Sequence, residues 1–155
     1  AATTRSPREG EAHGVNYYFL TTEDIRRRIA DGEFVEYEEV YPGRYYGTLR
    51  SEVERILDGG HNCILDIDVK GALNVKRIYG DRALSIFIMP PSVETLRQRL
   101  MSRATDSIEE IERRVAKADE EISYAPQFDV RVVNDNLSTA VTEVETAIKN
   151  FLAKP

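Results

Sequence analysis

The chain has 155 residues, enough for one domain with a hydrophobic core, and its 41% hydrophobic and 31% charged residues are ordinary for a soluble globular protein. Its net charge of −6 argues against a general nucleic-acid-binding protein, because such a protein needs a basic face to displace counterions from phosphates. The single cysteine, Cys63, cannot form an intramolecular disulfide, and no apolar run approaches the length of a membrane span. We therefore expect a cytoplasmic protein with neither a nucleic acid nor a membrane as partner.

The first 48 residues predict a small, mostly β segment with many charges. Residues 1–20 are polar and turn-rich and end in the strand-like sequence NYYFL. Thr22 is expected to cap a short helix that stops at Gly32. The alternation of apolar and polar side chains in FVEYEEVY predicts a half-exposed strand, and PGRYYGT predicts a turn followed by a short strand.

From residue 51 onward, predicted helices alternate with predicted strands. SEVERILDGG and VKGALNVKRIYG are expected to be helices that end at glycines, with the apolar strand NCILDID between them. The continuous apolar run ALSIFIMPP and the shorter VRVVND are typical of strands buried on both faces. Serines at 92, 107 and 138 are expected to cap the last three helices, with Ser107 and Glu110 at capping-box spacing. This order is typical of an α/β fold, in which a parallel sheet has helices on both faces.

A first group of candidate site residues surrounds two arginines near the start. Arg5 and Arg8 flank a proline, and two guanidiniums on such a stiffened loop can bind a phosphate in planar, charge-assisted pairs. Tyrosine hydroxyls can donate to the same oxygens, so the group also includes Tyr17, Tyr45 and Tyr46. An exposed loop with surface arginines is the alternative that composition alone favours.

A second group consists of acidic side chains. Ligands of parallel α/β folds bind beyond the carboxyl ends of the strands, where this sequence has Asp66, Asp68, Asn134 and Asp135. A carboxylate accepts two hydrogen bonds side by side, which suits the N–H pair on a guanine edge, and an acid at a strand end can also hold Mg²⁺. Glu36, Asp66 and Asp68 are the candidates, and ordinary solvated carboxylates are the alternative.

A third group lies on a predicted helical hairpin. Arg99 and Arg103 are four residues apart and share one helix face, and Arg114 follows after one connector. Such a hairpin is a candidate lid for the transfer of a phosphoryl group, where catalysis is mostly positioning and charge stabilisation. The alternative is a solvated helix face whose arginines pair with nearby acids, which are Glu94, Glu109, Glu110 and Glu112.

Five segments resemble the guanylate kinase family, in the family's order: TTRSPREGEAHGVNYYF, GEFVEYEEVYPGRYYGT, CILDIDVKGALNVK, PPSVETLRQRLMSRATDSIEEIERRVAKA and FDVRVVND. The resemblance runs from about residue 3 to the C-terminus, and the pattern TTR-x-PR-x-GE-x-x-G-x-x-Y is especially specific. It implies an enzyme of the P-loop nucleoside monophosphate kinase fold that transfers the γ-phosphoryl group of ATP to GMP, giving ADP and GDP, with Mg²⁺. It also implies three parts: a mixed β GMP-binding module at 1–50, a core at 51–92 and 115–155, and a helical lid at 93–114.

The resemblance implies roles for individual residues as well. The clamp on the GMP phosphate corresponds to Arg5, Arg8, Tyr17 and Tyr46, and the guanine contacts correspond to Glu36, Thr48 and Asp68. Asp66 lies near the metal and the phosphates, directly or through water. The side chains that gather the ATP phosphates and the transferred group correspond to Arg99, Arg103 and Arg114, and Asn134 corresponds to a contact on the adenine side.

The sequence departs from the family in three places. The phosphate-binding motif G-x-x-x-x-G-K-[ST], which the family carries on a central strand upstream of TTR, does not occur in the 155 residues. We therefore expect the sequence to be part of a longer enzyme and to transfer very little phosphate alone. Ala1 stands where serine is common, and Lys70 where glutamine is common. The alternative function is a non-catalytic guanylate-kinase-like domain that binds proteins.

Overall fold

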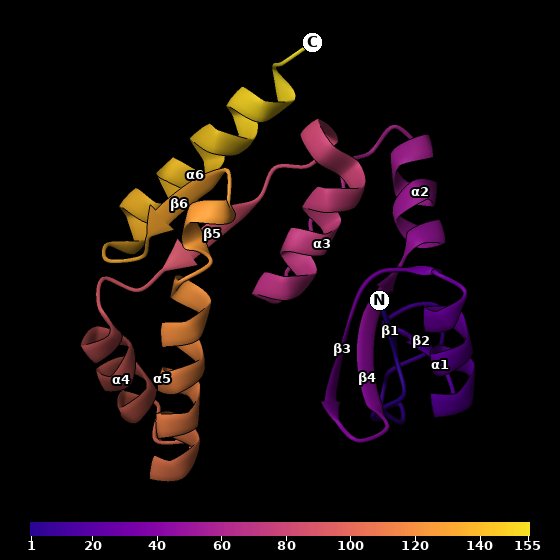
Figure 1. Ribbon diagram of the computed structural model, residues 1–155, viewed down its shortest axis with the longest axis horizontal. Helices are drawn as coiled ribbons and strands as arrows, with labels where there is room; N and C mark the ends of the chain where they lie inside the picture. Colours follow the sequence, from indigo (N-terminus) through magenta and orange to yellow (C-terminus); the bar gives the residue numbers. More distant parts are fainter. The chain divides into compact units, whose positions relative to one another are not determined.

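The computed structural model describes residues 1–155, which form two compact units, residues 1–80 and 81–155. The first unit contains a four-stranded mixed sheet in the order β2-β1-β4-β3 (Figure 1). Its strands are β1 (Ala2–Thr3), β2 (Tyr18–Phe19), β3 (Phe34–Tyr41) and β4 (Arg44–Leu49). β1 is parallel to β2 and antiparallel to β4, and β3 and β4 form an antiparallel hairpin. The predicted mixed β segment is therefore present, and only the two-residue β1 lacked a sequence signal.

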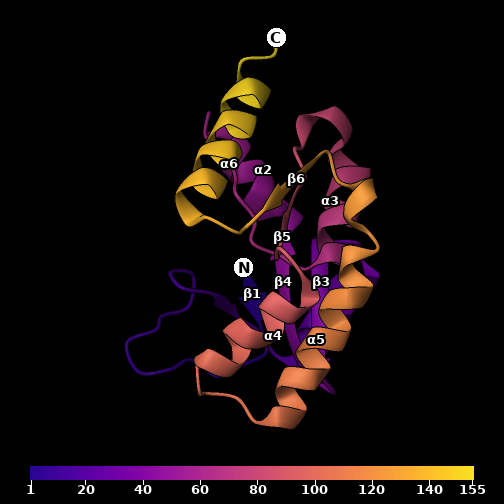
Figure 2. The ribbon, with the colours of Figure 1, turned by 90° about the vertical axis from the view of Figure 1, so that its left-hand side faces the viewer.

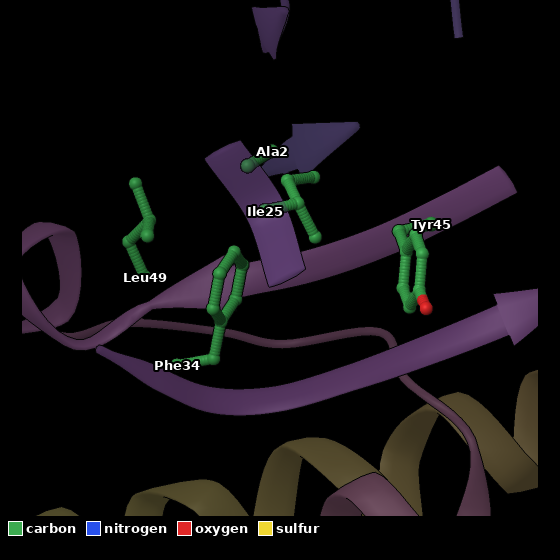
Figure 3. Packing of buried hydrophobic residues seen from close by; sticks show 5 residues of the cluster. All are labelled: Ala2, Ile25, Phe34, Tyr45 and Leu49. Carbon is green, nitrogen blue, oxygen red and sulfur yellow. The ribbon is translucent and has the colours of Figure 1, made fainter. Parts of the chain in front are cut away.

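Alternate side chains of this sheet face a small hydrophobic core. Helix α1 (Thr22–Ala30) contributes Ile25, which is 1% exposed and packs with side chains from β1, β3 and β4 (Figure 3). The other buried members of this cluster are Ala2, Phe34, Tyr45 and Leu49. The predicted cap of α1 was wrong by one residue: Thr21 has extended backbone angles and accepts from Asp24 N, so Thr22 is already helical. Because Tyr45 and Leu49 of β4 point into this core, the side chains that alternate with them point to the opposite face of the sheet.

Two further helices complete the first unit, α2 (Arg50–Asp58) and α3 (Val69–Tyr79). They end at Gly59 and Gly80, as predicted. The predicted strand NCILDID between them was wrong, because residues 61–68 form no strand and the side chain of Ile64 is 85% exposed. A strand is held by hydrogen bonds to a neighbour, and no segment of the chain pairs with this one.

The second unit is built on two parallel strands, β5 (Ile86–Met89) and β6 (Val130–Val133), with Ile86 opposite Val130. The parallel pairing confirms the predicted α/β class, but the expected burial on both faces was wrong. Phe87 and Val132 are buried, whereas Ile88 is 51% exposed and Val133 is 48% exposed. Burial alternates along each strand because only one face is covered.

Three helices accompany this pair: α4 (Val93–Ser102), α5 (Ile108–Ile122) and α6 (Leu137–Leu152). Helices α4 and α5 lie side by side (Figure 2) around a buried cluster of Leu100, Ile111 and Val115. Ser92 caps α4, and Ser107 forms the predicted capping box of α5. The predicted cap Ser138 was wrong, because Asn136 accepts from Thr139 N and starts α6 two residues earlier. None of these helices is long and apolar enough to cross a membrane.

Two short 3₁₀ turns, at Gly80–Arg82 and Ala125–Gln127, precede β5 and β6. The second turn places Phe128 against Phe87, with ring centroids 5.1 Å apart in an edge-to-face arrangement. Ser85 and Asp129 add a second link, because the Ser85 N–H and hydroxyl both donate to Asp129 Oδ2. These contacts hold the starts of β5 and β6 together.

Candidate active site

The guanidinium of Arg5 lies in a cage of aromatic and acidic groups within the first unit. Its carbon is 5.5 Å from the centre of the Tyr17 ring and 5.9 Å from that of Phe19. Its Nη2 donates to Glu11 Oε1 at 2.9 Å, and the Arg5 side chain is only 10% exposed. A cation held by ring faces and one carboxylate keeps a fixed direction, which suits the binding of an anion.

Tyr46 completes the aromatic side of this cage. Its ring meets that of Tyr17 edge to face, with centroids 6.2 Å apart. Tyr45, which sequence reasoning grouped with it, lies on the opposite face of β4 and is buried in the hydrophobic core (Figure 3). Successive side chains on a strand point to opposite faces, so only one tyrosine of this pair can face the cage.

Glu11 joins the two arginines of the predicted clamp. One carboxylate oxygen accepts from the Arg5 side chain, and the other accepts from the backbone N–H of Arg8 at 2.8 Å. The hydrogen bond from Arg5, followed by that from the Arg8 N–H, lowers the pKa of Glu11. The side chain of Arg8 is exposed. Sequence reasoning gave Glu11 no role, although it belongs to the GE pair of the most specific motif.

A second cluster forms where β3 faces β4. Glu36 and Thr48 are paired in the ladder and are 8% and 7% exposed. The Thr48 hydroxyl donates to Glu36 Oε1 at 2.7 Å. Burial raises the pKa of Glu36 and the nearby charge of Asp68 raises it further, while the Thr48 hydrogen bond lowers it. A buried carboxylate with a single protein donor is a strong acceptor for N–H groups.

Asp68 brings a second carboxylate to this cluster. It is the N-cap of α3, where its Oδ1 accepts from Gly71 N at 2.8 Å. Helix α3 packs against β3, and the side chain of Asn74 donates to the carbonyl of Val35 at 2.7 Å. Glu36, Thr48 and Asp68, which are 32 residues apart at most, are thus held by one hairpin and one helix start. Neither Asn74 nor Gly71 had a sequence signal.

The predicted donor-side residues lie in the second unit. Arg99 on α4 donates from Nη1 to the carbonyl of Asn134 at 2.7 Å, so the structure brings these two together. Arg114 pairs with Asp106 at 3.4 Å. Arg103 is exposed at the end of α4. Of the acids named as alternative partners, Glu94 and Glu112 pair with Arg97 instead, and Glu110 belongs to the capping box of α5.

Asp66 is the predicted metal contact, and it is an exposed residue of the segment 61–68. No group of three or more histidine, cysteine, aspartate or glutamate side chains is arranged to hold a metal ion. A Mg²⁺ ion carried by a nucleotide needs only one or two carboxylates, because phosphates and waters supply its remaining ligands. The single carboxylate of Asp66 is compatible with that kind of contact.

Comparisons with known proteins show which family the chain is similar to. The family model described as guanylate kinase matches residues 1–151. The guanylate kinase of Porphyromonas gingivalis is 58% identical over 154 residues, covering 99% of this chain and 82% of that protein. That of Bacteroides thetaiotaomicron is 55% identical over 154 residues, with 99% and 76% covered. A crystal structure of guanylate kinase from Anaplasma phagocytophilum has a TM-score of 0.73 and 33% identity, with 99% and 74% covered.

The fold and these matches define a kinase of the nucleoside monophosphate class. The chain belongs to the guanylate kinase family, whose enzymes are ATP:GMP phosphotransferases. Phosphoryl transfer in this family depends on ATP and generally requires a divalent metal.

Proposed function

We propose that this chain binds GMP through residues 1–50 together with Asp68, and contacts ATP through its second unit. The observation that carries this proposal is the buried carboxylate of Glu36, which is bonded to Thr48 and lies beside Asp68. Guanine presents two adjacent N–H donors, on N1 and on the 2-amino group, and paired carboxylates are matched acceptors for them. Adenine has no such donor pair, so the cluster favours a guanine acceptor.

The arginine and tyrosine cage would hold the phosphate of that nucleotide. Arg5 has its direction fixed by Glu11 and the Tyr17 ring, while the exposed side chain of Arg8 can move onto an arriving anion. The hydroxyls of Tyr17 and Tyr46 would donate to the same phosphate oxygens. Two arginines on one phosphate neutralise its charge and leave one oxygen to attack the donor nucleotide.

On the donor side, Arg99, Arg103 and Arg114 would gather the ATP phosphates, and Asn134 would contact the adenine. The fixed bond from Arg99 to the Asn134 carbonyl supports a link between these two contacts. We assign the lid to residues 93–114 and the core to 51–92 and 115–155. Asp66 would face Mg²⁺ bound to ATP, which supplies charge neutralisation at the phosphates, directly or through water.

In this mechanism the residues act mainly by position and charge. The attacking phosphate oxygen of GMP is held in line with the γ-phosphorus of ATP, and the arginines stabilise the charge on the transferred group. Closure of the lid excludes water, which would otherwise accept the phosphoryl group. Consumption of GMP and ATP places the protein in purine nucleotide metabolism, and we propose a cytoplasmic location for it.

A titration with GMP and guanosine tests the acceptor assignment. Arg8→Ala should weaken GMP by about tenfold or more, because a charge-assisted bond is lost, and should leave guanosine nearly unchanged. Arg27→Ala is the matched control, because Arg27 is an exposed arginine of α1 that pairs with Asp24. A folded protein that binds no GMP would instead favour a non-catalytic, protein-binding domain.

A further inference from the structure

Gly71 occupies a position where a side chain would collide with the guanine cluster. It is the third residue of α3, and its backbone does not require glycine, because its φ lies in the ordinary negative range. A Cβ at this position would lie 2.7 Å from Asp68 Oδ1 and 3.2 Å from both Cβ and Oε2 of Glu36. Glycine is disfavoured inside a helix, so the space above Gly71 needs an explanation other than backbone conformation.

The carboxylates of Glu36 and Asp68 both lie next to Gly71, and in each of them one oxygen accepts a hydrogen bond. Glu36 Oε1 accepts from Thr48, and Asp68 Oδ1 accepts from the Gly71 N–H. Each carboxylate has a second oxygen, and Glu36 Oε2 is the one that faces the missing side chain. Two negative groups brought this close repel each other unless a ligand donates to both.

We propose that Gly71 is a positioning residue for base specificity: its lack of a side chain lets Glu36 and Asp68 converge on the same guanine edge. This inference rests on the proposed function, since it takes the two carboxylates as the guanine acceptors. Any larger residue at 71 separates them. The atom closest to the new methyl group is the end of the Asp68 side chain, which can rotate away without moving backbone. Glu36 Cβ, at 3.2 Å, has to shift by only a few tenths of an ångström, so we expect the fold to be kept while the acceptor pair is lost.

The test compares Gly71→Ala with the unchanged chain in calorimetric titrations of GMP and of inosine monophosphate, which lacks the 2-amino group. GMP affinity falls by about tenfold or more, because bonds from both of its N–H donors to charged acceptors are weakened, while inosine monophosphate, which presents only the N1–H donor, loses affinity by a smaller factor. Gly59→Ala is the matched control, because Gly59 has φ −74° and a Cβ there meets nothing closer than 3.4 Å. Unchanged GMP affinity, or an equal loss for both nucleotides, overturns the inference.

Two additional variants distinguish the role of Gly71 from the assignment of Glu36 and Asp68 as guanine acceptors. Glu36→Gln and Asp68→Asn keep Gly71 and change the acceptors themselves. If neither alters the preference for GMP over inosine monophosphate, the guanine assignment fails. If both do and Gly71→Ala does not, only the role of Gly71 fails.

If Gly71→Ala lowers the melting temperature, a second substitution tests whether the contact with Asp68 is the cause. Asp68→Gly in that background keeps a residue that is tolerated at a helix N-cap but removes the oxygen that lies 2.7 Å from the new methyl group. Recovery of the melting temperature supports the proposed contact between residue 71 and Asp68. A melting temperature that stays low places the collision elsewhere and overturns the inference.

Discussion

The hydroxyl of Thr48 donates a 2.7 Å hydrogen bond to Oε1 of Glu36 across the β3–β4 ladder. Both side chains are buried, so the bond supplies the carboxylate with a donor that water cannot easily replace. It also fixes the direction of the second oxygen, which lies next to Gly71. Strand register, more than any local sequence signal, therefore determines where this carboxylate points.

Thr48→Val removes that donor at almost unchanged volume. The folded state should lose about 1–3 kcal/mol, because a buried carboxylate is left with an unmet hydrogen-bonding demand. GMP affinity should fall by about tenfold, since the acceptor is no longer held in one direction. Urea unfolding and calorimetric titration measure the two effects. Thr142→Val is the control, because that hydroxyl bonds only to the Ser138 carbonyl of its own helix; a Thr48 variant that behaves like it contradicts the role of this bond.

Glu36 should make the protein less stable as the pH rises. Burial raises the pKa of Glu36 above its unfolded value, so the folded state holds its proton more tightly than the unfolded state does. The free energy of unfolding therefore falls as the pH increases from the unfolded pKa through the folded pKa, and this loss is complete above the folded pKa. Below the unfolded pKa the carboxyl group is protonated in both states, so the cost of burying its charge is absent.

Glu36→Gln should accordingly raise the melting temperature at neutral pH, and the gain should vanish near pH 4. The neutral amide keeps an oxygen for the Thr48 hydroxyl but carries no charge to desolvate. GMP affinity should fall by roughly ten- to a hundredfold, because the bonds to a charged acceptor become weaker. Thermal melts from pH 4 to 8 give the first result. A variant that is less stable than the original chain at every pH would contradict the proposed cost of burying this carboxylate.

Much of the fold follows from local sequence signals that act at short range. The capping box of Ser107 and Glu110 forms as predicted, because both partners lie within one helical turn. The hairpin of β3 and β4 follows from its alternating pattern. The position of a helix cap is harder to predict where two suitable residues lie close together, and α6 is capped by Asn136 rather than by the predicted Ser138.

Other features depend on partners that no local pattern describes. The apolar run at 62–68 suggested a strand, but a strand requires a hydrogen-bonding neighbour, and Ile64 remains exposed. The candidate site was predicted mainly by family resemblance, since composition alone favoured solvated arginines and acids. Glu11 and Gly71 were missed because their importance lies in what they contact across space, which spacing along the chain does not reveal.

Glu11→Gln should weaken GMP binding by several-fold, because a neutral amide holds the Arg5 guanidinium less firmly than a carboxylate does. Guanosine binding should be unchanged, since Glu11 contacts only the two arginines of the phosphate clamp. Glu9→Gln is the matched control, because it makes the same change in charge at an exposed position two residues earlier. Equal GMP affinities of the two variants would show that Arg5 does not need this carboxylate.

Ile25→Ala tests whether the core under the sheet supports the site above it. Ile25 is 1% exposed and packs with Phe34, Tyr45 and other core residues, so the substitution should cost about 2–5 kcal/mol of unfolding free energy. Val15→Ala, at a residue that is 80% exposed, should cost almost nothing.

Tyr45 and Tyr46 are neighbours on β4, so loosening the core around Tyr45 should also disturb the opposite face, where Tyr46 lies in the phosphate cage. At temperatures where the Ile25 variant is still folded, its GMP affinity should fall by a smaller factor than that of Arg8→Ala, because the clamp residues themselves remain. A loss equal to that of Arg8→Ala would mean that the cage has no rigidity of its own and depends entirely on the core beneath it.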